Sequence, residues 1–300
     1  RETLMKVVVG ASSFSDSSDQ AIDLLLEKGI EVVKNPYKRK MTEDEIIAHL
    51  SGAEGLLAGL EPLNENVFKN APQLKAIARI GIGMDNVDLA AAKKYGIKVS
   101  NTPSGPTQAV AEMTLTALLT LIHQVLPSNE DVHNGIWKKR IGNSIRDMKV
   151  LVIGYGHIGR KTAELMESLG AEVLVYDKYN KAVATCSLED GLQKADVVTL
   201  HVNGNEEVIG RQEMELMQEG VVLLNSARGA VVNENALYDN LKNGKIAGFW
   251  GDALWQEPYN GKMCECKNAI LTPHICTYTS SCRESMETEA VKNLLKDLVD

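Results

Sequence analysis

Short runs of aliphatic residues alternate with segments of helical apolar spacing along almost the whole chain. The expected strands are residues 6–10, 31–33, 55–58, 75–80, 97–100, 149–153, 172–176, 196–200, 221–225, 246–251 and 269–272. The expected helices are residues 18–28, 42–50, 87–95, 107–126, 158–169, 187–194, 211–217, 233–243 and 282–299. This alternation is typical of βαβ units, and continuous apolar strands indicate parallel sheets that are covered on both faces. The sequence therefore predicts an α/β protein with doubly wound parallel sheets.

The strands fall into two series, one over residues 6–100 and one over residues 149–272. Between them lie the long helix 107–126 and a polar, turn-rich stretch at 127–130. The last helix, 282–299, follows the second series with no strand after it, so we expect it to fold back on the first domain. Two domains are therefore predicted.

Composition narrows the range of partners. The chain has 300 residues, 44% of them hydrophobic, so it can bury a large core, and its net charge of −8 argues against a nucleic acid or an anionic membrane as partner. The basic runs 38–40 and 138–140 are short and isolated, and we expect solvated surface there. The most apolar helical stretch, 115–126, is far shorter than the roughly 20 residues that span a bilayer. No leader pattern precedes the first strand, which favours the cytoplasm.

The cysteines indicate reduced thiols rather than disulfides or a metal site. There are five of them, an odd number in a chain with an adequate core. Cys264 and Cys266 are separated by a single residue, which is not the C-x2-C spacing of common zinc sites. We therefore expect no metal.

Two glycine-rich turns follow expected strands, and one has the full context of a dinucleotide site. There Gly154, Gly156 and Gly159 follow strand 149–153 and open a helix, and the next strand ends in Asp177. The first glycine permits the tight turn, the second lets a pyrophosphate approach the backbone, and the third lets helix and strand pack closely. The helix N-terminus offers N–H groups to the phosphates, and Asp177 would bind ribose hydroxyls and repel a 2′-phosphate. The loop predicts NAD rather than NADP, and a plain structural turn is the alternative.

The other turn, residues 79–86, lacks that context. Asn86 stands at the third glycine position, and the following strand leads into Asn101 rather than an acidic residue. Gly81 and Gly83 would still leave bare N–H groups near the carboxyl end of a strand. That arrangement suits a small anion better than a dinucleotide, and a plain turn is again the alternative.

Six segments, in order along the chain, resemble those of the D-isomer-specific 2-hydroxyacid dehydrogenase family, most closely its phosphoglycerate dehydrogenase-like branch. They are RIGIGMDNVD (79–88), NTP with AVAE (101–103 and 109–112), GYGHIG (154–159), NSARG (225–229), GDALWQEP (251–258) and LTPHI (271–275). Any one could arise by chance, but six in the right order are specific. The match covers nearly the whole chain.

The resemblance implies two Rossmann-like or flavodoxin-like domains with the active site in the cleft between them. The substrate-binding domain would comprise residues 1–101 and 277–300, and the NAD-binding domain residues 102–276. The family's catalytic positions match Arg228, Glu257 and His274. Its substrate-binding positions match Arg79, Gly81, Ile82 and Gly83. Its NAD-binding positions match Gly154, Gly156, His157, Ile158, Gly159, Asp177, His201, Val202, Ser226, Ala227, Arg228, Asp252 and His274, with Asp252 as the partner of the nicotinamide amide. A homodimer through helix 107–126, which is more apolar than one groove needs, is also implied.

The residue chemistry of Arg228 supports these roles independently. Arg228 follows strand 221–225 at its carboxyl end, where ligands bind in open α/β sheets. A guanidinium offers a planar fork of donors that suits a carboxylate and the adjacent C2 oxygen of a 2-oxo acid. The anion that meets Arg228 is therefore expected to be the substrate, and a structural salt bridge is the alternative.

His274 is the expected acid–base group. Hydride transfer to C2 of a keto acid leaves charge on the oxygen, which needs a proton in the same step, and histidine titrates near neutrality. Glu257 would favour the imidazolium and fix the orientation of the ring. Thr272 and Pro273 indicate a rigid, extended approach to the histidine. A lone histidine after proline, without these partners, would be structural.

The expected activity is the NAD-dependent interconversion of a small D-2-hydroxy acid and its 2-oxo acid. Arg79 matches a position that can face a phosphate, which favours 3-phosphoglycerate, but Gly59 stands where some such enzymes carry another arginine. Glyoxylate, hydroxypyruvate or another short keto acid is the alternative substrate. The segment 201–205 lacks the family's usual proline-leucine pair, and Cys276 stands where a glycine is common.

Two rival functions stay open at this point. An NAD-sensing binding protein of the corepressor type shares the fold and the three catalytic positions. A methyltransferase with the same glycine loop would leave Arg228, Glu257 and His274 without a role.

Overall fold

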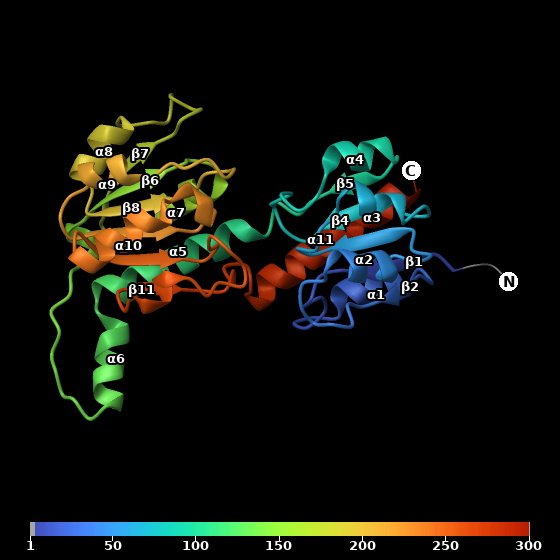
Figure 1. Ribbon diagram of the computed structural model, residues 1–300, viewed down its shortest axis with the longest axis horizontal. Coiled ribbons are helices and arrows are strands. Elements are labelled where there is room, and N and C mark those ends of the chain that lie inside the picture. Colours follow the sequence, from blue (N-terminus) through green and yellow to red (C-terminus); the bar gives the residue numbers. More distant parts are fainter. Residues whose placement is uncertain (1–3, 300) are drawn as a thin grey trace. The chain divides into compact units, whose positions relative to one another are not determined.

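The structure, a computed structural model, describes residues 4–299 and divides the chain into two compact units (Figure 1). Unit 1 comprises Arg1–Pro106 and Tyr278–Asp300, and unit 2 comprises Thr107–Thr277. Each unit is built on a parallel sheet, as the alternation of strands and helices predicts. The assignment of substrate binding to 1–101 with 277–300, and of NAD binding to 102–276, stays a prediction.

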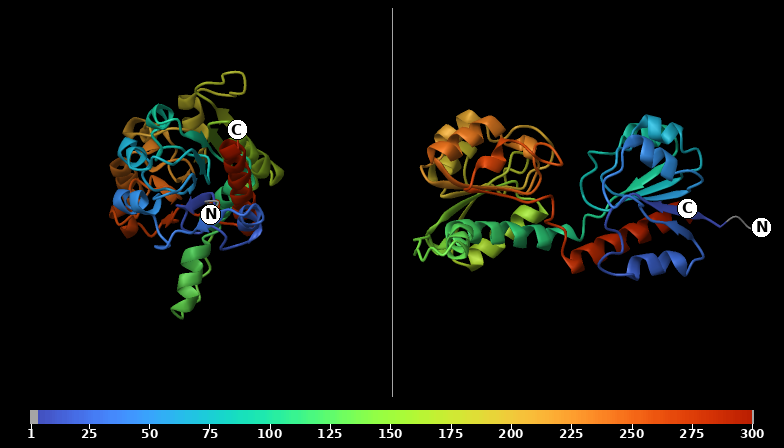
Figure 2. Two further views of the ribbon diagram at one scale, coloured as in Figure 1. Left: turned by 90° about the vertical axis from the view of Figure 1, so that its right-hand side faces the viewer. Right: turned by 60° about the horizontal axis from the view of Figure 1, so that its bottom comes forward.

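Unit 1 contains a five-stranded parallel sheet in the order β2-β1-β3-β4-β5. Its strands are β1 (Lys6–Val9), β2 (Glu31–Val33), β3 (Gly55–Ala58), β4 (Ala76–Arg79) and β5 (Lys98–Ser100). Its helices are α1 (Gln20–Leu26), α2 (Glu43–His49), α3 (Glu65–Lys69), α4 (Leu89–Lys94) and α11 (Ser280–Val299). Val8, Leu56 and Ile77 join α2, α3 and α4 in one apolar cluster. On the other face α11 packs beside α1, so the last helix of the chain completes the first sheet (Figure 2).

Unit 2 contains a six-stranded parallel sheet in the order β11-β10-β9-β8-β6-β7. Its strands are β6 (Lys149–Ile153), β7 (Glu172–Tyr176), β8 (Val197–Leu200), β9 (Val221–Asn225), β10 (Ile246–Gly251) and β11 (Ala269–Leu271). Its helices are α5 (Pro106–Ile122), α6 (Val125–His133), α7 (His157–Ser168), α8 (Leu188–Lys194), α9 (Arg211–Leu216) and α10 (Glu234–Asn243).

Both faces of the unit 2 sheet are covered, which explains why its strands read as unbroken apolar runs. Leu151 and Leu223 join α8, α9 and α10 in one buried cluster. The neighbouring residues Val150 and Val222 join α5 and α7 in another. Because successive strand residues point to opposite faces, the two clusters lie on the two sides of one sheet.

In each sheet the strand order reverses between the first and the third strand, at β1/β3 in unit 1 and at β6/β8 in unit 2. Open α/β sheets bind ligands outside the carboxyl ends of their strands at such a reversal. Gly10 and Gly59 follow the two strands in unit 1, and Gly154 and His201 follow them in unit 2. The topology alone therefore marks these two edges as candidate sites.

Two expectations about helices are wrong. The helix expected at 107–126 ends at Ile122, where Gln124 adopts a left-handed conformation with φ +56°, and α6 begins at once. The stretch 127–130, expected as a turn, lies in α6, because Pro127 occupies the first turn, where a missing N–H costs nothing. Helix α3 was not expected. It has only five residues, and its signal is the Asn64 cap, whose side chain accepts from the Val67 amide at 3.1 Å.

Exposed apolar side chains gather on α6 and the segment after it, and α6 buries none of its residues. They are Val125 (49% exposed), Leu126 (50%), Val132 (56%), Ile136 (50%), Trp137 (85%) and Ile141 (97%). Helix α5, by contrast, buries Leu118 and Ile122 in the core of unit 2.

No single helix in the described part of the chain is long and apolar enough to cross a membrane, and the bent pair α5 and α6 meets that test by length and composition only.

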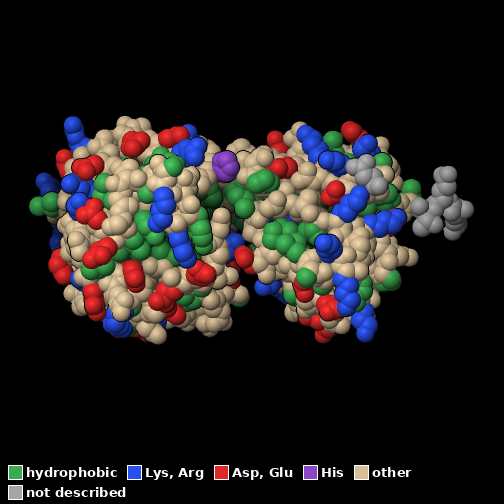
Figure 3. Space-filling model, turned by 90° about the horizontal axis from the view of Figure 1, so that it is seen from above, with side chains coloured by type: hydrophobic (Ala, Val, Ile, Leu, Met, Phe, Trp, Pro, Cys, Tyr) green, Lys and Arg blue, Asp and Glu red, His purple; other side chains and the backbone are tan. Residues whose placement is uncertain are grey.

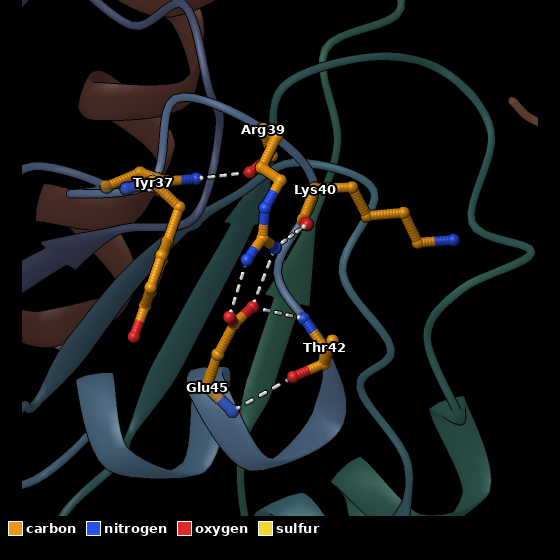
Figure 4. Close-up of polar contacts among 6 residues, drawn as sticks. Tyr37, Arg39, Lys40, Thr42 and Glu45 are labelled. Atoms are coloured by element: carbon orange, nitrogen blue, oxygen red, sulfur yellow. Dashed lines mark hydrogen bonds and ion pairs between the residues drawn. The ribbon is translucent and has the colours of Figure 1, made fainter.

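The short basic runs lie on the surface, as expected. Arg39 donates to the two carboxylate oxygens of Glu45, at 2.9 and 2.7 Å, and Glu45 also accepts from the Thr42 amide in the capping box of α2 (Figure 4). The bond from Arg39 and that from Thr42 hold the pKa of Glu45 at about 2. Arg140 pairs with Asp131 at 2.8 Å. On the face seen in Figure 3, acidic and basic side chains are interspersed.

Candidate active site

The glycine loop of unit 2 has the shape that a dinucleotide phosphate requires. Gly154 has φ +90°, and its amide donates to the Tyr176 carbonyl at 2.9 Å. A Cβ on Gly159 would collide with the Gly154 carbonyl oxygen, so this glycine lets α7 pack against the turn. Gly156 precedes α7 without a side-chain cap, and no described atom lies within 4 Å of the position that its Cβ would take. The open backbone and the uncapped helix N-terminus fit the pyrophosphate of NAD.

Asp177 follows β7 and holds the same loop in place. Its Oδ2 accepts from the Tyr155 amide at 2.8 Å, and its Oδ1 accepts from the amides of Tyr179 and Asn180 at 2.9 and 2.8 Å. Burial raises the pKa of the carboxyl, but these backbone bonds outweigh it and leave the pKa below its ordinary value. Asp177 is therefore an anion beside the glycine loop, as NAD selection requires.

The remaining residues predicted to contact NAD lie at the same edge of the sheet. His201 follows β8; its Nε2 lies 2.9 Å from the Thr199 hydroxyl and its Nδ1 lies 2.8 Å from the Ser226 hydroxyl. Burial lowers the pKa of His201 to about 3, so the ring is neutral near pH 7. Val202 is half-buried and Ala227 is buried. At the start of α7, His157 is exposed and Ile158 is half-buried.

Arg228 lies just beyond β9, half-buried at this edge. Its Nη1 donates to the Ala227 carbonyl at 2.9 Å, and its own carbonyl accepts from the Asn225 side chain at 2.8 Å. The residue after Arg228 must be glycine, because a Cβ on Gly229 would collide with the backbone of Leu254 and Trp255. Trp255 donates its indole N–H to the Val232 carbonyl at 2.7 Å and packs on the cluster around Phe249.

His274 and Glu257 form a pair that the positive charge of Arg228 reaches. The His274 Nδ1 lies 3.1 Å from Oε1 and 3.2 Å from Oε2 of Glu257, and the two side chains are 35% and 40% exposed. Burial raises the pKa of Glu257. The hydrogen bond and charge of His274 and the charge of Arg228 outweigh burial and leave the pKa below its ordinary value, so the carboxyl stays ionised. Unit 2 thus brings the three predicted catalytic residues together.

Asp252 is buried behind His274 and supports the segment that carries it. Its Oδ1 accepts from the Thr272 hydroxyl at 2.6 Å and the Ile275 amide at 2.9 Å, and its Oδ2 accepts from the Cys276 amide at 3.0 Å. These bonds hold His274 in a left-handed conformation, φ +55°, that residues other than glycine adopt rarely. Burial and the nearby Asp252 charge raise the pKa of the Cys276 thiol, so the cysteine at this position is an unreactive packing group.

The residues predicted to bind the substrate lie in unit 1, at the last residue of β4 and in the turn after it. Gly81 has φ +142°, and its amide is not bare as expected, because it donates to the Thr102 hydroxyl at 2.8 Å. Ile82 is exposed and Gly83 is half-buried. Arg79 is only 8% exposed, and its guanidinium folds back onto the Ile80 carbonyl.

One charged residue at this edge, Glu61, is fully buried and was not expected to matter. The support that Asp252 gives to residues 272–276 was not expected either. Both depend on contacts between segments far apart in the chain, for which no motif exists. Among residues 4–299, no group of three or more His, Cys, Asp or Glu residues has an arrangement that could hold a metal ion.

The protein has two parallel α/β units, a dinucleotide-type glycine loop, and an arginine, a glutamate and a histidine at the carboxyl edge of one sheet. These features are typical of a nucleotide-dependent oxidoreductase. The sequence model of the family described as "D-isomer specific 2-hydroxyacid dehydrogenase, NAD binding domain" matches residues 115–276, more than half of the chain. The chain belongs to this family and is an NAD-dependent oxidoreductase of the D-2-hydroxyacid dehydrogenase class.

Curated relatives cover most of the chain. A glyoxylate reductase from Thermococcus litoralis is 31% identical over 90% of this chain and 90% of its own length. D-3-phosphoglycerate dehydrogenase from Escherichia coli is 39% identical over 78% of this chain, which spans 61% of that longer protein. The solved D-lactate dehydrogenase from Aquifex aeolicus, in complex with NAD and lactic acid, is 28% identical with a TM-score of 0.80, over 98% of this chain and 95% of its own.

Proposed function

We propose that this enzyme reduces a short 2-oxo acid to the D-2-hydroxy acid and catalyses the reverse oxidation, with Arg228, Glu257 and His274 as its reacting set. The observation that carries the proposal is the His274–Glu257 pair beside Arg228, on the same sheet edge as the glycine loop. Arg79, Gly81, Ile82 and Gly83 of unit 1 complete the substrate site in this proposal.

Each catalytic side chain has a role that its chemistry supports. Bound NADH supplies the hydride that reduces C2 of the keto acid. Arg228 binds the carboxylate and polarises the C2 oxygen through its planar donors. The Nε2 of His274 donates a proton to that oxygen as charge develops, while its Nδ1 stays on Glu257. Glu257 is ionised and therefore stabilises the protonated ring before transfer.

The cofactor site supports NAD over NADP. Asp177 is an anion held by three backbone amides beside the loop, and a 2′-phosphate there would meet its negative charge. The ribose hydroxyls of NAD, by contrast, can donate to its carboxylate oxygens.

The assembly in this proposal is a homodimer in the cytoplasm. The exposed apolar residues of α6 and of residues 136–141 support a second copy as their partner, so the contact lies mainly beyond the helix at 107–126. All five cysteines carry free thiols, which supports a reducing compartment.

The test is turnover of NADH with glyoxylate, pyruvate, hydroxypyruvate and 3-phosphohydroxypyruvate, followed by NADH absorbance and repeated with NADPH. We expect turnover of at least one acid with NADH, weaker turnover with NADPH, and loss of activity in Arg228→Ala. The matched control is Arg211→Ala, because Arg211 is exposed and pairs with Asp239 on the surface. NADH binding without turnover of any keto acid would instead favour the NAD-sensing protein.

A further inference from the structure

The three proposed catalytic residues of unit 2 lie on three successive segments at the edge of its sheet. Arg228 follows β9, Glu257 follows β10 and His274 follows β11. Asp252, just after β10, bonds to the segment that carries His274 and so joins the second segment to the third. Alignment of all three residues also requires a joint between the first segment and the second.

Two aromatic residues make that joint, and they flank Glu257 two residues before it and two residues after it. The indole N–H of Trp255 donates to the Val232 carbonyl at 2.7 Å. The hydroxyl of Tyr259 donates to Oε1 of Glu234 at 2.5 Å. Both bonds end on the stretch that leads from β9 into α10, which begins at Glu234. The loop that carries Glu257 is therefore anchored on both sides to the segment that follows β9.

Apolar packing and backbone contact reinforce the two hydrogen bonds. The ring of Trp255 packs against the rings of Phe249 and Tyr259, with centroids 6.0 and 5.9 Å away. Trp255 and Tyr259 also pack on the buried cluster of unit 2. The backbone of Leu254 and Trp255 occupies the position that a Cβ on Gly229 would take. The two segments are thus in direct contact, and the indole bond fixes how they meet.

The same loop determines the state of the Glu257 carboxyl. Burial raises the pKa of Glu257, but the hydrogen bond and charge of His274, a backbone hydrogen bond from Leu254 and the charge of Arg228 leave it below its ordinary value. Leu254 directly precedes Trp255, so the indole bond also holds the Leu254 backbone in place. The ionised state of Glu257 therefore depends on the position of its loop.

We infer that Trp255 and Tyr259 are positioning residues, which hold the loop of Glu257 against the segment of Arg228 and so align these two catalytic side chains. The inference rests on the proposed function, in which Arg228 binds the keto acid and Glu257 supports the proton donor. The indole N–H and the tyrosine hydroxyl donate within unit 2, so both residues act through the loop. Such placement matters because a displacement of about 1 Å can cost roughly 100-fold in rate.

The first test is Trp255→Phe, which keeps an aromatic ring and removes the N–H. We expect kcat for keto acid reduction to fall about tenfold or more. The Kd for NADH should stay within about threefold, because Gly156 and Asp177 lie on other loops. The matched control is Tyr238→Phe, which removes a hydroxyl bonded to Glu265 at the same apolar cluster and should leave kcat unchanged. Equal kcat values for the two variants, with both folded by thermal unfolding, would contradict the inference.

The second test is a double-mutant cycle on the other anchor. Tyr259→Phe and Glu234→Ala should each lower kcat about threefold or more, and the double variant should lose no more than either single one, because all three lack the same bond. Glu234→Gln keeps an acceptor oxygen and should retain most of the activity. Additive losses, or full activity in both single variants, would contradict the inference.

Turnover of no 2-oxo acid by the unaltered protein would refute the proposed function, and the carboxyl of Glu257 would then decide the inference. Its titration can be followed by ¹³C NMR, with the signal assigned through Glu257→Gln. We expect Trp255→Phe to raise the pKa of Glu257, because the bonds from His274 and Leu254 weaken when the loop moves. Tyr238→Phe should leave this pKa unchanged. The same titration in Trp255→Phe and in the unaltered protein would overturn the inference.

Discussion

The carboxyl edges of the two sheets have the same topology and opposite chemistry. Both sheets reverse between the first and third strand, and both carry a glycine turn at their edge. In unit 2 the edge presents an open backbone at Gly156 and partly exposed side chains at Arg228 and His274. In unit 1 the charged groups, Glu61 and Arg79, are buried and act on one another. The topology fixes where a site can lie, and the side chains at the edge decide what it binds.

The difference follows from what each turn leaves for a ligand. The amide of Gly81 is already used by the Thr102 hydroxyl, whereas Gly156 opens a twelve-residue helix with no side-chain cap. A helix N-terminus of that kind attracts a pyrophosphate, and the unit 1 turn, with its Gly81 amide engaged, offers a ligand one donor fewer. The two edges therefore divide the work of cofactor binding and substrate selection in the proposed enzyme.

The largest expected effect comes from the histidine of the unit 2 edge. His274→Asn removes the proton donor and should lower kcat by about 10²–10⁴-fold, the usual contribution of a general acid, with a smaller change in NADH affinity. Unit 1 also has a histidine near a strand end, because His49 Nε2 lies 3.1 Å from the Val9 carbonyl. His49→Asn is the matched control and should leave kcat close to that of the unaltered enzyme. Steady-state kinetics that rank the two variants alike would remove the distinction between the edges.

A smaller effect is expected from the glycines of the NAD loop. Gly156→Ala places a methyl group in open space, so folding should be unaffected, while the Kd for NADH should rise about tenfold or more because the pyrophosphate loses close approach to the backbone. Gly159→Ala should lower thermal stability instead, because its methyl group would collide with the Gly154 carbonyl. NADH titration and thermal unfolding separate the two. Unchanged NADH affinity in Gly156→Ala would contradict the assignment of the loop.

The sequence predicts what is local and misses what is made by distant segments. All eleven expected strands form, within a residue or two of their expected bounds, because apolar runs buried on both faces leave a clear signal. The motifs also lead to Arg228, Glu257 and His274, which lie in one unit. The break between α5 and α6 depends on one left-handed residue, Gln124, which apolar spacing does not reveal.

The buried acids were harder to predict for the same reason. Glu61 lies in an ordinary polar stretch of the sequence, and only the approach of the chain at Gly10 and Gly59 buries it. Asp252 was expected to contact the nicotinamide amide, which stays a prediction, and its support of residues 272–276 was not expected. Burial of this kind is a property of the assembled fold.

The smallest expected effect concerns His201, the neutral histidine at the unit 2 edge, and it appears in stability rather than activity. Burial lowers its folded-state pKa to about 3, below the value of 6.5 for an unperturbed histidine. Between these values the unfolded chain binds a proton that the folded chain does not, so this group's stabilising contribution is complete above pH 6.5 and is lost as the pH falls toward about 3. The loss from this group is at most about 1.4 kcal/mol per pH unit. His201→Gln should flatten the fall in unfolding free energy across that range, measured by denaturant titration, whereas His133→Gln, on the exposed helix α6, should not. Parallel pH profiles for His201→Gln and the unaltered protein would contradict this prediction. They would show that His201 binds a proton in the folded state, and the unit 2 edge would then resemble an exposed surface more than the buried edge of unit 1.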